Sequence, residues 1–129
     1  MDKTISSLMT KNIVTVDAED TVDRVEAIMD THKLSCVPVI DSQGGCFGVI
    51  SSSDLMHFHM LHKNQKAERA WEVCTHKVIE VGPDISVKEA AELMIRKKIH
   101  HIVVMENKSI KGIVSSIDIV SEYLLKQNA

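Results

Sequence analysis

This chain of 129 residues has few aromatic residues and no net positive charge. Aromatic side chains make up 3% of the sequence, and the formal net charge at pH 7 is −3. A general nucleic-acid binder normally presents a basic face, and a single-strand binder needs several aromatic side chains on which bases can stack. We therefore expect no nucleic acid among the partners of this protein.

Long apolar runs are also absent. The sequence contains no run long enough to span a bilayer, and its first residues, Met1-Asp2-Lys3-Thr4, lack the apolar core of a signal peptide. The hydrophobic content of 44% and charged content of 26% are ordinary for a soluble protein that buries a core. These features predict a cytoplasmic protein that neither crosses nor binds a membrane.

Residue spacings typical of metal, redox or catalytic sites are also lacking. Cys36, Cys46 and Cys74 have no metal-type spacing and are expected to be reduced, mostly buried thiols. His57, His59 and His62 invite a metal hypothesis, but no cysteine or carboxylate follows at a zinc-type spacing, so an exposed helix surface is favoured. The sequence shows no Ser-His-Asp order, nucleophile elbow or paired-carboxylate pattern. We predict no catalytic residue, no enzymatic activity and no metal site. A metal- or redox-responsive protein remains a weaker alternative.

What the sequence does contain is an internal repeat that covers nearly the whole chain. The two copies align at a shift of 65 residues, which falls to 64 after the turn at Gly44 and Gly45. The longest match pairs Gly48–Leu55 with Gly112–Ile119, each reading Gly, two β-branched residues, Ser, Ser, any residue, Asp, apolar. The β-branched pair favours a buried strand, and the Ser and Asp favour a helix N-cap. Each match therefore predicts a strand that runs directly into a helix.

Apolar spacing and turn residues predict the order β-α-β-β-α in each copy, and so an α/β (α+β) fold. In the first copy we expect strands at 13–16, 36–40 and 46–50, a hairpin turn at 41–45, a helix at 22–31 with Thr21 as N-cap, and a helix from Asp54 onward. In the second copy we expect strands at 78–81, 102–105 and 110–114, and helices at 87–97 and 119–125, with Ser86 and Glu89 forming a capping box. Residues 1–62 are interpreted as the first repeat, 63–71 as a linker and 72–129 as the second repeat. Residues 1–9 should include a short helical turn that packs on the opposite half.

These motifs resemble a tandem pair of cystathionine-β-synthase (CBS) domains, a Bateman module, over about residues 5–125. The Gly-apolar-apolar-Ser/Thr-x-x-Asp-apolar signature is present twice, with Ser where Thr is more usual. An opening Met-Thr is matched by Met9-Thr10, whereas Cys74-Thr75 matches only the Thr. The apolar-Pro-Val-apolar-Asp strand is matched from Val37 to Asp41, whereas the second copy has Ile102-Val103-Val104-Met105-Glu106 without proline.

The resemblance implies two repeats packed sheet to sheet with pseudo-two-fold symmetry, and clefts between them that bind adenosine-containing ligands. Such ligands include AMP, ADP, ATP and S-adenosylmethionine, and no cofactor is required. By the same resemblance, Asp54 and Asp118 hold ribose hydroxyls, and Ser51 and Ser115 lie toward ribose or phosphate. The implied adenine slots and additional contacts are Ile13, Val37 and Pro38 in one copy, Val78, Ile102 and Val103 in the other, and Thr10 and Thr75.

Elementary chemistry agrees with a ribose and phosphate site, although each motif also has a purely structural explanation. A ribose diol offers two donors, and one carboxylate can accept both, but Asp54 and Asp118 could also merely cap helices. The second copy carries a basic cluster that could attract an anionic ligand, richer than His32 and Lys33 in the first: Arg96, Lys97, Lys98, His100 and His101. A basic run is equally typical of a solvated helix end.

Taken together, the sequence predicts a regulatory ligand-sensing module without an effector domain, whose output passes through an unknown effector protein. A homodimer is expected, with the apolar helices at 53–61 and 117–125 forming its face. The alternative is a protein-interaction or dimerisation module that binds no metabolite, which the missing proline and the Ser-for-Thr exchange favour slightly.

Overall fold

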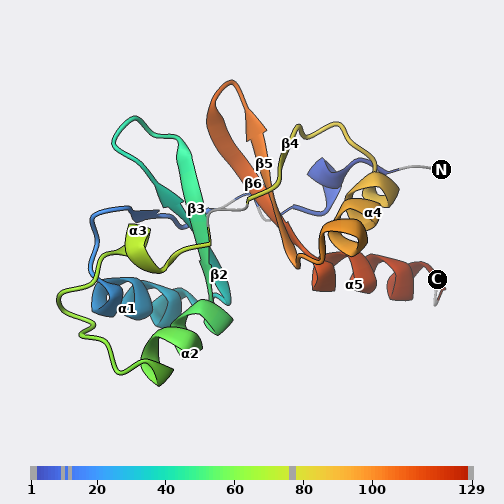
Figure 1. Cartoon of the computed structure of the whole chain (residues 1–129). Helices are drawn as coiled ribbons and strands as arrows, with labels where there is room; N and C mark the ends of the chain where they lie inside the picture. Colours follow the sequence, from blue (N-terminus) through green and yellow to red (C-terminus); the bar gives the residue numbers. More distant parts are fainter. Residues whose placement is uncertain (1–2, 10, 12, 76–77, 128–129) are drawn as a thin grey trace. The chain divides into compact units, whose positions relative to one another are not determined.

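The structure, a computed structural model, describes residues 3–9, 11, 13–75 and 78–127 (Figure 1). It contains two three-stranded sheets with strand orders β1-β2-β3 and β4-β5-β6. The elements follow along the chain as the 3₁₀ turn η1 (Ile5–Ser7), β1 (Val16–Asp17), α1 (Val22–His32), β2 (Cys36–Ile40), β3 (Cys46–Ser51), α2 (Ser52–Met60), α3 (Ala70–Val73), β4 (Glu80–Val81), α4 (Val87–Lys97), β5 (His101–Glu106), β6 (Ser109–Ser115) and α5 (Ser116–Gln127). The predicted α/β fold and the repeated β-α-β-β-α order are confirmed.

The described residues divide by packing into two units. The first unit runs from Val14 to Val78, and the second unit joins the segment up to Ile13 to the chain from Ile79 onward. In each sheet the first strand pairs parallel to the second, and the second pairs antiparallel to the third. The repeat boundaries at residues 62 and 72 remain a prediction about the repeats, because packing divides the chain by a different criterion.

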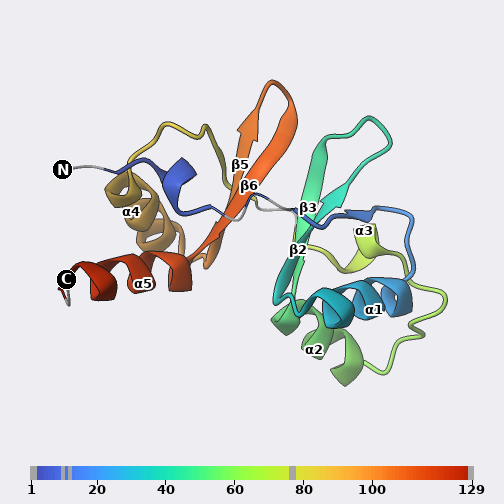
Figure 2. The same ribbon diagram turned by 180° about the vertical axis from the view of Figure 1, so that it is seen from behind.

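The first unit forms around a core beneath its β2–β3 hairpin. Helix α1 buries Val22, Val25 and Met29, which recur at the spacing of one helix face. Val25 and Met29 join a core cluster with Val16, Val37, Val39, Ile50, Ala70 and Cys74. Figure 2 shows α1 and α2 beside the same hairpin, in the unit that also carries α3.

The hairpin turns explain why the repeat shift changes by one residue. In the first unit Gly44 has φ 84°, and the Asp41 carboxylate accepts from the backbone N–H groups of Gln43 and Gly45 at 2.9 Å each. In the second unit Asn107 and Lys108 have φ 53° and 64° between the paired residues Glu106 and Ser109. Positive φ at both central residues is the geometry of a tight two-residue hairpin turn. The second loop is therefore shorter.

The N-terminal segment packs into the second unit, as predicted. Ile5 is fully buried in a cluster with residues of α4, β5 and β6. Its N–H donates to the Ile85 carbonyl at 2.9 Å, and the Val87 N–H donates to the Lys3 carbonyl at 2.8 Å. Lys3 Nζ also lies 2.7 Å from Glu122 Oε1 of α5. Residues 3–9 thus contribute to a core formed mainly by the second repeat.

The segment at 70–75 makes the corresponding connection in the first unit. The Ala70 N–H donates to the Asp20 carbonyl at 2.8 Å, and the Trp71 N–H donates to the Ala18 carbonyl at 3.1 Å. Thr75 then pairs with Val49 of β3 through two backbone hydrogen bonds of 2.8 and 3.1 Å. Each unit therefore includes the segment that directly precedes the first strand of the other repeat.

Several predicted element boundaries are wrong. The strands expected at 13–16 and 78–81 are shorter than predicted, with β1 at Val16–Asp17 and β4 at Glu80–Val81. Few residues of these segments pair with β2 and β5. The helix expected from Asp54 begins earlier, at Ser52, and the closing helix expected to include 119–125 runs from Ser116 to Gln127. Asp54 occupies the third helical position rather than the first, because Ser51 is the N-cap.

Two predicted helix caps also differ in detail. The Thr21 side chain donates to the Asp23 carboxylate and makes no capping hydrogen bond to the backbone. Ser86 Oγ accepts from the Glu89 N–H at 3.0 Å as expected, but the Glu89 carboxylate accepts from the Ser86 hydroxyl at 3.5 Å rather than completing the box through the backbone. Both positions remain N-caps by backbone conformation.

Within the described ranges, no helix has both the length and the apolar character needed to cross a membrane.

Candidate functional site

The signature of the first repeat fixes the Asp54 carboxylate at the junction of β3 and α2. Asp54 Oδ2 accepts from the Ser51 N–H at 2.8 Å and from the Ser51 hydroxyl at 3.0 Å. In return, Ser51 Oγ accepts from the Asp54 N–H at 3.3 Å. This reciprocal capping box satisfies donors that the first turn of a helix otherwise leaves open. It also holds the half-buried carboxylate in one orientation.

Thr75, near the C-terminal end of the first unit, contacts the same carboxylate. Its hydroxyl donates toward both carboxylate oxygens, at 3.1 Å from Oδ1 and 3.3 Å from Oδ2. The structure therefore brings together three of the predicted site residues, Ser51, Asp54 and Thr75. By the repeat alignment Thr75 belongs to the second copy, yet it packs in the first unit.

The signature glycine makes this approach possible. A Cβ atom on Gly48 would lie 2.6 Å from the Thr75 carbonyl oxygen and 2.9 Å from Cys74 Sγ. Real Cβ atoms do not approach other heavy atoms so closely, and the first obstacle is backbone. Gly48 is therefore required for the close passage of the 74–75 segment rather than for an unusual backbone angle.

The signature of the second repeat forms the same box. The Ser115 N–H donates to Asp118 Oδ2 at 2.8 Å, and the Asp118 N–H donates to Ser115 Oγ at 3.1 Å. Met9 lies against Gly112, where an added Cβ would be 2.7 Å from Met9 Cγ. Met9 thus corresponds to Cys74 in the first unit. Thr10, the predicted counterpart of Thr75, lies outside the described residues.

The residues predicted to form adenine slots fall into two groups. Val37 and Ile102 are fully buried and point into the unit cores, since both belong to the core clusters. Their neighbours Pro38 and Val103 are also buried and, by strand alternation, lie on the opposite face of each sheet. Ile13 and Val78 are half-buried and lie outside the strands. In the first unit a ligand on the Pro38 face of the sheet could reach only backbone atoms of Val37, and in the second unit a ligand on the Val103 face could reach only those of Ile102.

The two sites differ at the first residue of the second strand. Cys36 pairs with Ser51 in one sheet, and His101 pairs with Ser115 in the other. Burial raises the pKa of the Cys36 thiol to about 12, with further increases from the negative charge of Asp54 and from Cys46. Burial lowers the pKa of His101, and His100 lowers it further, whereas Asp118 opposes the change. The first site thus has a neutral thiol where the second has an imidazole.

The cysteines are thiols, as predicted, and Cys36 and Cys74 are buried while Cys46 is half-buried. Burial also raises the pKa of the Cys74 thiol to about 11, and the charge of Asp54 contributes. Both buried thiols stay protonated at neutral pH and are poor nucleophiles. A redox role for these two residues is therefore not favoured.

The basic cluster of the second repeat is only partly at the site. Arg96 and Lys97 are exposed in the last turn of α4, and Lys98 ends the helix in a left-handed conformation with φ 55°. This arrangement matches the explanation by a solvated helix end. His101 is the member of the cluster that the β5–β6 register places opposite Ser115.

Histidines of the first repeat have other contacts. His59 Nε2 lies 2.9 and 3.0 Å from the two carboxylate oxygens of Glu26, which links α2 to α1. In the part of the chain that the structure describes, no group of three His, Cys, Asp or Glu residues is placed to hold a metal ion.

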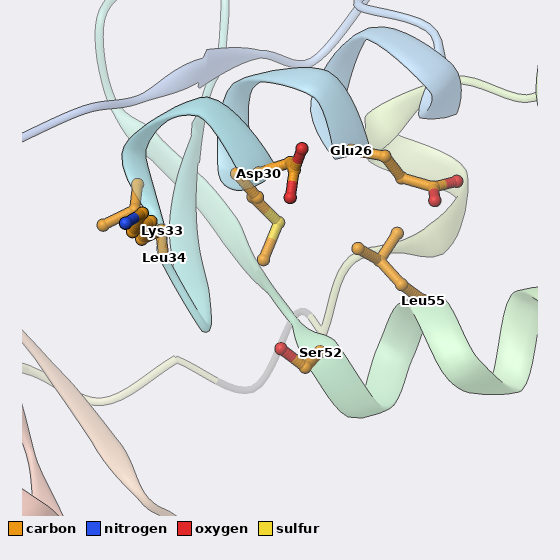
Figure 3. A pocket seen from close by; sticks show the side chains of 7 residues that line it. Glu26, Asp30, Lys33, Leu34, Ser52 and Leu55 are labelled. Atoms are coloured by element: carbon orange, nitrogen blue, oxygen red, sulfur yellow. The ribbon is translucent and has the colours of Figure 1, made fainter.

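Two hollows in the first unit were not predicted from the sequence. One of about 290 Å³ lies between α1 and α2, with Asp30, Ser52 and Leu55 around it (Figure 3). The other, of about 270 Å³, includes Asp54 and His57 of α2 together with Glu68, Glu72 and Val73. Both depend on how helices pack together, and no local sequence pattern signals such packing.

Comparison with known proteins shows the family. The CBS domain family model matches residues 5–60 and 70–125. Two curated relatives from Methanocaldococcus jannaschii are the uncharacterized protein MJ1404, 26% identical over 92% of this chain, and inosine-5′-monophosphate dehydrogenase, 25% identical over 98% of it. The chain spans only 31% and 25% of the lengths of those two proteins.

Solved structures show the same fold. The CBS domain pair of protein MJ0100, in complex with 5′-methylthioadenosine and S-adenosyl-L-methionine, matches with a TM-score of 0.86 and 24% identity, covering 98% of this chain and 99% of that one. A hexameric CBS-CP12 protein from bloom-forming cyanobacteria matches with a TM-score of 0.88 and 24% identity, covering 98% and 75%. With one family match in each repeat and this fold, the chain belongs to the CBS domain family as a tandem pair of CBS domains.

Proposed function

We propose that this protein is a regulatory module that senses an adenine nucleotide or another adenosyl ligand through Asp54 and Asp118. The observation that carries the proposal is the repeated strand-to-helix junction, where a capping box fixes a half-buried carboxylate. A fixed carboxylate suits a ribose diol, because its oxygens can accept from both hydroxyls without first being ordered.

The family relationship supports this chemistry. CBS domain pairs are regulatory modules, and the MJ0100 pair holds two adenosyl compounds. The match to inosine-5′-monophosphate dehydrogenase spans a quarter of that enzyme, so its activity is not carried over to this chain. We propose that the output of this module passes to an effector protein, and that the ligand acts by binding two conformations with different affinity.

Calorimetry with AMP, ADP, ATP and S-adenosylmethionine tests the proposal. We expect at least one to bind and to raise the melting temperature, because a ligand of the folded state stabilises it by mass action. The matched control is the double variant Asp54→Asn, Asp118→Asn, whose amide oxygens can still accept from the Ser51 and Ser115 N–H groups while the negative charge is lost, and which should bind more weakly. Lack of binding to all four compounds at millimolar concentration would remove the adenosyl-sensor function.

A second candidate function, assembly through the helices, is favoured by the apolar surface of α5. Ile117, Val120 and Leu124 are 68%, 50% and 54% exposed and recur at helical spacing. Met56 and Met60 of α2 are 65% and 70% exposed, one helical turn apart. We propose that these surfaces form a homodimer. The hexameric state of the CBS-CP12 neighbour supports association in this fold without fixing its order here.

A further inference from the structure

The Asp54 carboxylate already receives several donors from the protein itself. Oδ2 accepts from the Ser51 N–H, the Ser51 hydroxyl and the Thr75 hydroxyl, and Oδ1 accepts from the Thr75 hydroxyl. An ionised carboxylate offers about four lone-pair sites in all. The single Thr75 hydroxyl hydrogen is shared between Oδ1 and Oδ2, so the three protein donors leave about one of these sites free. A ribose diol that donates two hydrogen bonds to Asp54 therefore needs the site that Thr75 occupies.

Of these donors, Thr75 is the one that can leave without disturbing the fold. The Ser51 N–H donates within the capping box that begins α2 and Ser51 Oγ accepts there, so the Ser51 side chain cannot turn away without opening the box. The Thr75 side chain is exposed, and its backbone is held independently by two hydrogen bonds to Val49. Rotation about its Cα–Cβ bond would move the hydroxyl away from Asp54 while the pairing with β3 stays intact.

We propose that Thr75 competes with the ribose diol of an adenosyl ligand for the Asp54 carboxylate and thereby lowers the affinity of the first repeat's site. The inference rests on the proposed function, because it concerns the same carboxylate. It reverses the role implied by family resemblance, in which Thr75 is an additional ligand contact. Ligand binding would then change the contact between Asp54 and the segment 70–75, which precedes β4. A change at the site could thereby affect the chain that follows.

Two substitutions at Thr75 separate competition from ligand contact. Thr75→Val keeps the branched shape and removes the hydroxyl, whereas Thr75→Ser keeps the hydroxyl. Both are made in an Asp118→Asn background, so that the first repeat's site dominates the measurement. Binding of adenosine and of 2′,3′-dideoxyadenosine, which lacks the diol, is measured by calorimetry. Thermal melts of each variant verify that it is folded.

Competition predicts that Thr75→Val binds adenosine about three- to tenfold more tightly, the range expected for removing one competing hydrogen bond. Thr75→Ser should bind adenosine like the Thr75 parent. The dideoxy compound should show no gain with Thr75→Val, because it has no diol to benefit from the vacated sites. A gain for adenosine alone is the signature that a purely structural role of Thr75 would not produce.

Other results overturn the inference in distinguishable ways. Weaker adenosine binding by Thr75→Val would make Thr75 a ligand contact, and unchanged binding would make it irrelevant to affinity. An equal gain for both compounds would show that the hydroxyl does not compete with the diol. Absence of adenosine binding both in the unmodified chain and in Thr75→Val would overturn the proposed function itself at Asp54, and the inference with it.

Discussion

Asp54 and Asp118 occupy equivalent positions, but the side chains beside them differ. The buried Cys36 thiol lies near the first, and the half-buried His101 imidazole near the second. Only the imidazole can carry positive charge. Differences between the two sites in ligand preference should therefore trace to these neighbours rather than to the carboxylates.

At the residue scale, we expect Asp118→Ala to weaken binding of an anionic ligand such as AMP more than Asp54→Ala does. The reason is that His101, whose ring N–H can donate to a phosphate oxygen, pairs with Ser115 of the second signature, whereas Cys36 holds the equivalent place in the first. Calorimetry on the two single variants tests the ranking. Equal losses of affinity would refute it, and adenosine, which lacks the phosphate, serves as the uncharged control.

A second residue-scale prediction concerns the titration of His101. Asp118 partly offsets the effects of burial and of His100 on the pKa of His101. Asp118→Asn should therefore lower that pKa further, because the imidazolium loses a stabilising negative charge. An NMR titration of the histidine ring signals measures this directly, and Asp54→Asn is the control that should leave His101 unchanged.

A third residue-scale prediction concerns the signature glycines, Gly48 and Gly112. Gly48→Ala should destabilise the fold by about 1–3 kcal/mol, because its Cβ would meet the Thr75 backbone carbonyl. Gly112→Ala should cost less, since a change of rotamer can move Met9 Cγ and leaves only the 2.9 Å approach to Met9 Cβ, which needs a small backbone shift. Urea denaturation of the two variants gives the comparison. A larger loss for Gly112→Ala would contradict the assigned role of the 74–75 segment.

At the scale of elements, the capping boxes and hairpins were predictable because they form from residues close in sequence. The Ser-x-x-Asp pattern placed both helix starts within a few residues, and the turn at Gly44 was placed correctly. The lengths predicted for the strands β1 and β4 were too great. Their β-branched residues indicate an extended chain, but strand length depends on which of them find a partner in β2 or β5.

The apolar surface of α5 gives a prediction at the same scale. Ile117→Asp should convert the proposed homodimer to monomer, because it places a charge in the dimer face. The helix itself should tolerate the change, since Ile117 lies in its first turn, where a negative charge is favourable. Light scattering coupled to gel filtration measures the mass. Lys111→Gln, at an exposed position of β6, changes the net charge by the same amount and should leave the mass unaltered. A monomeric wild-type protein would refute the proposed dimer.

At the scale of the whole molecule, the N-terminal segment should be essential for stability. Ile5 is fully buried among residues far along the chain, so Ile5→Ala should lower the free energy of unfolding by about 2–5 kcal/mol. Ile95, which is 78% exposed in the same unit, is the matched control, and its change to alanine should cost less than about 0.5 kcal/mol. Similar melting temperatures for the two variants would contradict the packing of residues 3–9.

The sequence by itself determined the repeat, the order of its elements, the two capped carboxylates and the family, because each depends on local spacing or on matched motifs. Only the tertiary structure decided that Thr75 donates to Asp54 in the first unit, while Met9 lies against Gly112 in the second. Repeat alignment pairs Thr75 with Thr10 and is silent about which unit each segment joins. That choice follows from long-range backbone pairing and from the space left by a glycine, and neither is encoded in any short stretch of residues.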